Sequence, residues 1–413
     1  MKNQGFPASS SWMLCIGWIL ITALACMPAA AQPGDAARYL AGLPLPEHST
    51  YQSLVDDEWQ SYQESFNTAW QALEQDRFQP MRDWQAQVLA SEILPDLPVY
   101  YPFGGPDMIH ALMLYPHSQD YLLFGLEPPG SLELHPDATP EERHQLLDAV
   151  QWALRDIYQR GYFITGRMSS DLNRRELDGV LPLLLVFIAR GGYEVLAIEH
   201  GWLLPDGRFD TNTSEHLSRG LVTDDADASP DESRDPRPAD CANIPGVRVR
   251  FRANDNSPEK QVTYLRLDVS DAGLKDCRAL ETYVTGLGPT NTFIKSASYL
   301  LHYATFSRVR RLTLAVSDSV FQDDTGIPYR DFDQADWDIL LFGRYTTPIR
   351  DFSGVFQPDL NQAYMTKAHS IDNLPFSMGY HWWTSAQNHL IARRRQPLAK
   401  PASKENAGSL SRP

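Results

Sequence analysis

Two acidic residues and a histidine lie where a folded chain could bring them to one site. Asp107 follows Gly104 and Gly105, in a loop where backbone can approach a ligand closely, and Glu127 follows the next apolar run. His110 comes three residues after Asp107, so the two side chains would share one face of a helix. A carboxylate pair, with or without an imidazole, suits acid–base chemistry such as glycosidic hydrolysis.

Each of these side chains also has a structural explanation. An acid in the first turn of a helix is stabilised by the helix dipole, which alone would account for Asp107. Glu127 would equally suit a solvated loop. The chemistry therefore depends on whether the fold brings Asp107, Glu127 and His110 into one pocket.

A second polar segment, residues 322–330, has the sequence QDDTGIPYR. Its Asp323, Asp324 and Arg330 could bind a ligand or a cation, or could hold each other in a rigid loop. Loops that bind Ca²⁺ place their acids at alternate positions, whereas these two acids are neighbours. The structural interpretation is therefore favoured.

The sequence lacks the signatures of common catalytic and cofactor sites. Its histidines show neither an HExxH motif nor a cysteine pair with histidine partners. GxSxG, Walker and GxGxxG motifs are also missing. We therefore predict no metal site and no cofactor, and leave open whether the chain is an enzyme.

Three short elements would position the two acids. Residues 99–101 are β-prone, residues 108–115 have helical spacing of apolar residues, and residues 120–126 form a second apolar run. This order predicts a βαβ unit with Asp107 and Glu127 at the carboxyl ends of neighbouring parallel strands. Open α/β sheets hold ligands at such strand ends.

Patterns in the rest of the chain predict an α/β fold, with a mixed or mostly parallel sheet flanked by helices, a preceding helical segment and a β-hairpin in the second half. Thr139 and Glu142 indicate a capping box at the start of a helix that ends at Gly161. The other helices are expected over residues 50–75, 81–94, 180–190, 280–303 and 309–320, and the other strands over 162–165, 193–199, 247–253, 261–269 and 337–343.

Composition divides the chain into five parts. Residues 223–240 are acidic and contain almost nothing that could be buried, so they form either a linker or a surface insertion. They separate an N-terminal helical and α/β part (32–222) from a second α/β part (241–391). Residues 392–413 are expected to form a disordered tail.

The first 31 residues predict export. Lys2 precedes an apolar run, Trp12–Ala25, which is followed by Ala29-Ala30-Ala31, the pattern of a secretory signal peptide. Cleavage after Ala31 would leave a periplasmic or secreted protein, without a stable transmembrane span. The alternative is a lipoprotein anchored at Cys26.

Two cysteines remain after the signal peptide, Cys241 and Cys277. In an oxidising compartment they would form a disulfide, and the alternative is two separate buried thiols.

The net charge of −16 argues against a nucleic-acid partner, since phosphate binding needs a concentrated basic face. The partner is therefore unknown, with an envelope glycan or another protein as possibilities.

Four segments resemble a family of exported bacterial proteins. They are YPFGGPD at residues 101–107, GLEP at 125–128, QDDTGIPYR at 322–330 and FQPDL at 356–360. Residues 177–179 and 296–299 fit the same pattern. The resemblance covers most of the chain after the signal peptide, and it implies export but supplies no reaction, substrate or cofactor.

Two functions are compatible with these patterns. The first is an exported cell-envelope protein that binds a ligand or partner through the loops at its strand ends. The second is a hydrolase of an envelope polysaccharide or ester, metal-independent or metal-assisted, that uses Asp107 and Glu127 as acid and base.

Overall fold

A short βαβ unit carries the two acids, as predicted. Strand β1 (Val99–Tyr101) leads into helix α5 (Met108–Leu114) and then into strand β2 (Asp120–Gly125), which pairs with β1 in parallel. The computed structural model describes residues 32–132, 134, 138–172, 177–211, 243–275, 277–349, 352, 354–367, 371–381 and 387–399.

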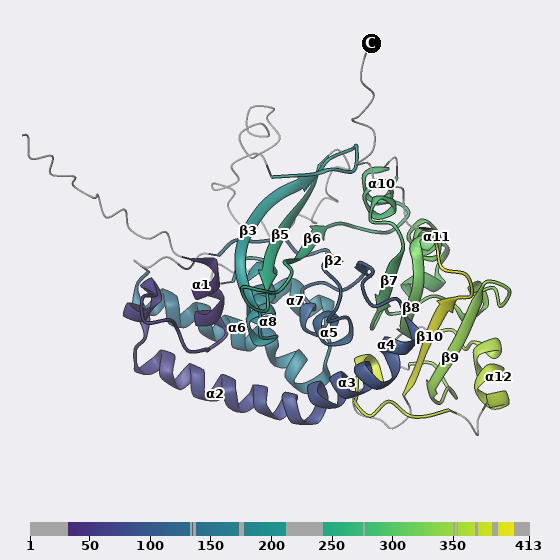
Figure 1. Ribbon diagram of the computed structural model, residues 1–413, viewed down its shortest axis with the longest axis horizontal. Coiled ribbons are helices and arrows are strands. Elements are labelled where there is room, and N and C mark those ends of the chain that lie inside the picture. Colours follow the sequence, from purple (N-terminus) through teal and green to yellow (C-terminus); the bar gives the residue numbers. More distant parts are fainter. Residues whose placement is uncertain are drawn as a thin grey trace, which may run out of the picture. The chain divides into compact units, whose positions relative to one another are not determined.

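The described residues form a ten-stranded mixed sheet (Figure 1). Its order is β4-β3-β5-β6-β2-β1-β7-β8-β10-β9, and the five central strands from β6 to β8 are parallel. The predicted fold class is confirmed. The other strands are β3 (Glu194–Leu203), β4 (Phe209–Asp210), β5 (Ile244–Arg252), β6 (Lys260–Arg266), β7 (Thr290–Ile294), β8 (Ser317–Asp323), β9 (Trp337–Gly343) and β10 (Asn388–Arg394).

Helices cover both faces of the sheet, and neighbouring side chains on one strand enter different cores. Tyr101 belongs to the core that also holds the apolar residues of α1, α2, α5, α6 and α8, whereas Tyr100 belongs to the core with α10, α11 and α12. The helices are α1 (Pro33–Leu40), α2 (Asp57–Leu73), α3 (Gln79–Trp84), α4 (Ala90–Glu92), α6 (Pro140–Arg160), α7 (Thr165–Asp171), α8 (Leu181–Arg190), α10 (Ala279–Gly286), α11 (Ser307–Val316) and α12 (Pro358–Lys367).

The N-terminal helical segment is more continuous than predicted, running without a break from Asp57 to Glu92, and it begins later than the predicted residue 50. Two π-helical turns, Glu74–Phe78 and Gln85–Leu89, join α2 to α3 and α3 to α4. One face of α2 carries mostly aromatic residues at helical spacing, and this face is buried in the core. Its residues are Trp59, Tyr62, Phe66, Trp70 and Leu73.

Helix α6 begins and ends at the predicted residues. The Thr139 hydroxyl accepts a hydrogen bond from the backbone N–H of Glu142 (3.3 Å), and the Glu142 carboxylate accepts one from the backbone N–H of Thr139 (2.9 Å). Gly161 ends the helix with a φ of +75°, a conformation that glycine adopts without steric cost. This end matters because Gly161 contacts the site described below.

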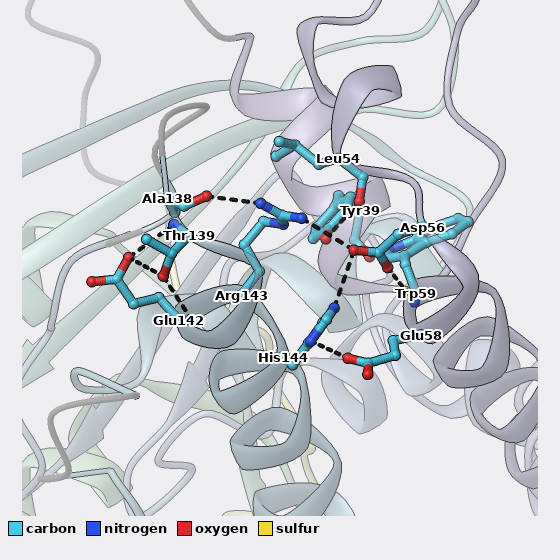
Figure 2. Close-up of polar contacts among 10 residues, drawn as sticks. All are labelled: Tyr39, Leu54, Asp56, Glu58, Trp59, Ala138, Thr139, Glu142, Arg143 and His144. Carbon is cyan, nitrogen blue, oxygen red and sulfur yellow. Dashed lines mark hydrogen bonds and ion pairs between the residues drawn. The ribbon is translucent and has the colours of Figure 1, made fainter.

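Side chains tie the start of α6 to the start of α2 (Figure 2). One oxygen of Asp56 caps α2 by accepting from the backbone N–H of Trp59 (2.8 Å). Its other oxygen contacts Arg143 and His144 of α6 (3.1 Å each), and His144 also contacts Glu58. A polar cluster thus stabilises the contact between the starts of α2 and α6, in addition to apolar packing.

The predicted hairpin is confirmed as the antiparallel pair β5–β6. Strand β3 pairs antiparallel with β5, so the chain on both sides of residues 212–242 belongs to one sheet. The acidic segment 223–240, the N-terminal residues 1–31 with Cys26, and Cys241 lie outside the described residues. Cys277 is buried, and its predicted disulfide stays a prediction.

Three predicted elements are wrong. Residues 162–164 are not a strand but a loop before α7. Residues 290–294 form strand β7, followed by a loop and two short 3₁₀ turns rather than a helix to residue 303. The helix expected over 309–320 ends at Val316, because residues 317–323 pair with β7 as strand β8.

Near the chain end, β10 extends to Arg394, inside the segment for which we expected disorder. No helix of the described residues has both the length and the apolar character that crossing a membrane requires.

Candidate functional site

Four charged residues lie at the carboxyl ends of four adjacent strands. Glu127 follows β2, Asp107 follows β1, Lys295 follows β7 directly, and Asp323 is the last residue of β8. All four side chains are buried, with at most 4% of each residue exposed. Buried charges at the strand ends of a parallel sheet are unusual, since ionised groups are rarely buried without partners.

Asp107 is the centre of a buried polar network. One of its carboxylate oxygens lies 2.6 Å from Nδ1 of His110, and the other accepts a hydrogen bond from the Tyr101 hydroxyl (2.8 Å) and pairs with the Lys295 ammonium. Lys295 also donates to the carbonyl oxygen of Gly161 (2.7 Å). Asp107 is the N-cap residue of α5, as the helix-start explanation expects, but its side chain makes no capping hydrogen bond and engages the buried network instead.

These contacts determine which groups carry charge. Burial favours the neutral form of Asp107, but His110 and Lys295 outweigh it and lower the pKa of Asp107 to about 2. Burial lowers the pKa of His110 and of Lys295, although Asp107 opposes both shifts. Asp107 is therefore a carboxylate at neutral pH, held by three buried partners.

A cavity of about 540 Å³ opens above this network. The loops after β1, β2 and β7 line it, together with the chain after α6 and the segment that contains Tyr380. Asp107 and Lys295 face it, as do Gly104, Gly105 and Glu127, and most other lining side chains are aromatic or aliphatic. Its size and apolar character are those of small-molecule sites in proteins.

Glu127 differs from Asp107 in making no ion pair among the described residues. Only 3% of the residue is exposed, yet neither carboxylate oxygen has a hydrogen-bond partner among the described residues. Burial raises the pKa of Glu127, although the backbone N–H groups of Leu126 and Glu127 and the charge of Arg266 oppose this shift. The solvated-loop explanation fails, because this carboxyl group is enclosed in the cavity wall.

Strained backbone clusters around the same cavity. Four non-glycine residues of the described chain have positive φ, and Phe103, Ser296 and Ser298 among them line the cavity, with φ values of +67°, +57° and +53°. The fourth, Tyr299, follows directly in the same loop. Each such residue costs roughly 1–3 kcal/mol, and such strain is concentrated at functional sites.

The segment 322–330 has mostly a structural role. Asp323 accepts hydrogen bonds from the backbone and hydroxyl of Thr325, and Asp324 accepts one from the Tyr299 hydroxyl. Gln357, from the FQPDL segment, donates to the Asp324 carbonyl oxygen (2.9 Å). Asp323 and Asp324 thus hold their own loop and the loop after β7 in place.

Arg330 lies outside this arrangement. Its side chain is 73% exposed and lies 3.8 Å from Asp331, and it does not line the cavity. The fold therefore brings Asp107 and Glu127 to one cavity but leaves Arg330 outside it. His110 contacts Asp107 and is fully buried, but it does not line the cavity.

Lys295 and Ser296 were missed because residues 290–303 carry a helical pattern. They could be identified only by recognising residues 290–294 as a strand, because they follow its end. This strand is hard to recognise, since several of its buried side chains are polar.

The described residues contain no group of three or more histidine, cysteine or acidic side chains placed to hold a metal ion. Comparison with known proteins yields no match, whether with family models, with curated proteins or with solved structures. The resemblance to exported bacterial proteins consequently stays a prediction.

Proposed function

We propose that the protein is an exported cell-envelope protein that binds a small organic molecule in the cavity above Asp107 and Lys295. The observation that carries this proposal is the cavity itself, a largely apolar space at the carboxyl ends of parallel strands with a few buried polar groups. The signal peptide predicted over residues 1–31 supports the location.

The network around Asp107 favours binding over nucleophilic chemistry. Both carboxylate oxygens of Asp107 are engaged by Tyr101, His110 and Lys295. Lys295 is likewise bonded to Asp107 and to Gly161. Groups that are fully paired shape and polarise a binding site, whereas a nucleophile needs a free lone pair directed at the substrate.

A thermal-shift screen of the purified protein against small neutral, cationic and anionic molecules tests the proposal. A ligand present at a hundred times its dissociation constant adds about 2.7 kcal/mol to the free energy of unfolding. Leu300→Trp should abolish the shift, because Leu300 lines the cavity and a larger side chain fills it. The matched control, Leu94→Trp at an exposed position outside the cavity, should keep it. Binding that survives Leu300→Trp would place the ligand elsewhere.

One observation favours a second function, hydrolysis with Glu127 as general acid. The pKa of Glu127 is raised by burial, and the pKa of Asp107 is lowered by His110 and Lys295, so the pKa values of the two carboxyl groups shift in opposite directions. Divergent pKa values are typical of acid and base pairs in hydrolases. Release of product from envelope glycans or from simple esters by the wild type but not by Glu127→Gln would establish it.

A further inference from the structure

Glu127 is a cavity residue whose carboxylate lacks a hydrogen-bond partner among the described residues. Its carboxylate is enclosed in the wall. Tyr264 lies nearby, but its hydroxyl donates to the carbonyl oxygen of Glu127 (2.9 Å). A buried acid without a partner costs free energy, which a ligand that supplies the partner would recover.

The other charged groups near the cavity have partners in the protein. Lys295 pairs with Asp107. Arg160 lies 4.0 Å from Asp156 of the same helix, and Arg266 donates to the carbonyl oxygen of Leu126 (3.1 Å). Arg266 also acts on Glu127 through its charge, but neither Glu127 oxygen has a hydrogen-bond partner among the described residues. The Glu127 carboxylate is therefore the group that a ligand can pair with, and the matching ligand is a cation.

A site for an organic cation needs an anionic group, here Glu127, and benefits from aromatic rings, which this cavity also contains. Tyr380 packs edge-on against Tyr162, with ring centroids 4.8 Å apart, and its ring lies 4.7 Å from that of Phe352. All three rings line the cavity. The Tyr380 hydroxyl is fixed by Ser298 (2.6 Å) and by the carbonyl oxygen of Ser296 (2.9 Å). The faces of aromatic rings attract organic cations, and these three residues form part of the cavity wall.

We infer that the cavity binds an organic cation, with its ammonium group paired to the Glu127 carboxylate and its apolar body against the aromatic rings. This inference rests on the proposed binding function and names its ligand class. An anion is disfavoured, because it would face the Glu127 carboxylate, and because the Lys295 ammonium is already paired with Asp107. A neutral molecule of the same shape would leave Glu127 without its charge partner.

Calorimetric titrations with three probes of similar shape test the inference. The probes are phenethylamine, 2-phenylethanol and phenylacetate, which carry a positive charge, no charge and a negative charge. We expect phenethylamine to bind at least about tenfold more tightly than the alcohol. Glu127→Gln keeps the shape of the side chain and should bring that ratio close to one. Glu141→Gln, at an exposed acid of α6, should leave it unchanged.

The outcomes separate this inference from the proposed function. Equal affinities for amine and alcohol, tighter binding of phenylacetate, or a ratio that survives Glu127→Gln would each overturn the cation inference and leave cavity binding intact. The same holds if none of the three probes binds while another molecule of the thermal-shift screen does. If no molecule of either set binds, both the inference and the proposed function are wrong.

Discussion

The apolar half of the parallel sheet, strands β1 and β2, and its polar half, strands β7 and β8, are built from different kinds of residue. In β2 the buried positions are apolar, with Tyr121, Leu122, Leu123 and Phe124 in sequence. In β7 three consecutive buried residues are polar, from Thr290 to Thr292. Both strands are central and parallel, yet one is stabilised by apolar packing and the other largely by hydrogen bonds between side chains.

The polar strands satisfy their buried groups with each other. Thr292 and Ser317 share a hydrogen bond between their hydroxyl groups (2.5 Å), and Ser319 donates to the side-chain oxygen of Asn291 (2.7 Å). Asn291 in turn donates to the carbonyl oxygen of Leu94 (2.7 Å). Because each group has a partner, burial costs little, and the pairing fixes one register between β7 and β8.

The two halves meet at the buried pair of Asp107 and Lys295. The apolar half supplies the carboxylate after β1, and the polar half supplies the amine after β7. The cavity lies above this junction, so its floor depends on both kinds of strand.

The largest effect should come from breaking that pair. Lys295→Met would leave the Asp107 carboxylate buried without its ammonium partner. The free energy of unfolding, measured by urea denaturation, should fall by about 3–5 kcal/mol. Lys275→Met, at an exposed lysine, is the matched control and should change it by less than about 0.5 kcal/mol. In the double variant Asp107→Asn/Lys295→Met much of the loss should return. Additive losses would show that the two residues are not coupled.

In the apolar half, Leu123→Ala should cost about 2–5 kcal/mol, because it removes a fully buried side chain and leaves a cavity. The same urea denaturation measures it. A loss below 1 kcal/mol would mean that β2 is not held by packing.

In the polar half, Thr292→Val keeps the shape of the side chain and removes its hydroxyl group. The expected loss is about 1–2 kcal/mol, from the Ser317 hydroxyl left without this partner. If the valine variant is as stable as the wild type, the hydrogen bonds between β7 and β8 do not stabilise the sheet.

The smallest effect should be a gain in stability. Since burial raises the pKa of Glu127 above its ordinary 4.5, the native state holds this proton more tightly than the unfolded state. Stability from this group is present below pH 4.5 and is lost as pH rises through the native pKa. Glu127→Gln should remove that loss and make the protein more stable at neutral pH. Thermal unfolding as a function of pH measures the difference, and parallel curves for the two proteins would contradict it.

The same contrast explains what could be predicted from sequence. Strands β1 and β2 are short apolar runs bounded by glycine and proline, so Asp107 and Glu127 could be placed at neighbouring strand ends. Strand β7 has the sequence TNTFI, in which buried polar residues hide the strand pattern. Its apolar neighbours also continue a helical period, so Lys295 could not be placed at a strand end.

The sequence therefore predicted the acidic residues of the site but not their basic partner Lys295. The contact between Asp107 and His110 follows from spacing on one helix, but the pairing of Asp107 with Lys295 joins residues 188 positions apart through an unpredicted strand. Arg330 illustrates the opposite error, because a motif near the acids in sequence need not face the cavity in space.

The most direct test of the binding site is a crystal structure of the protein soaked with phenethylamine. We expect density for the amine within hydrogen-bonding distance of the Glu127 carboxylate, with its ring against Tyr162, Tyr380 or Phe352. Density for the bound amine at another surface, with the cavity filled only by water, would contradict the account.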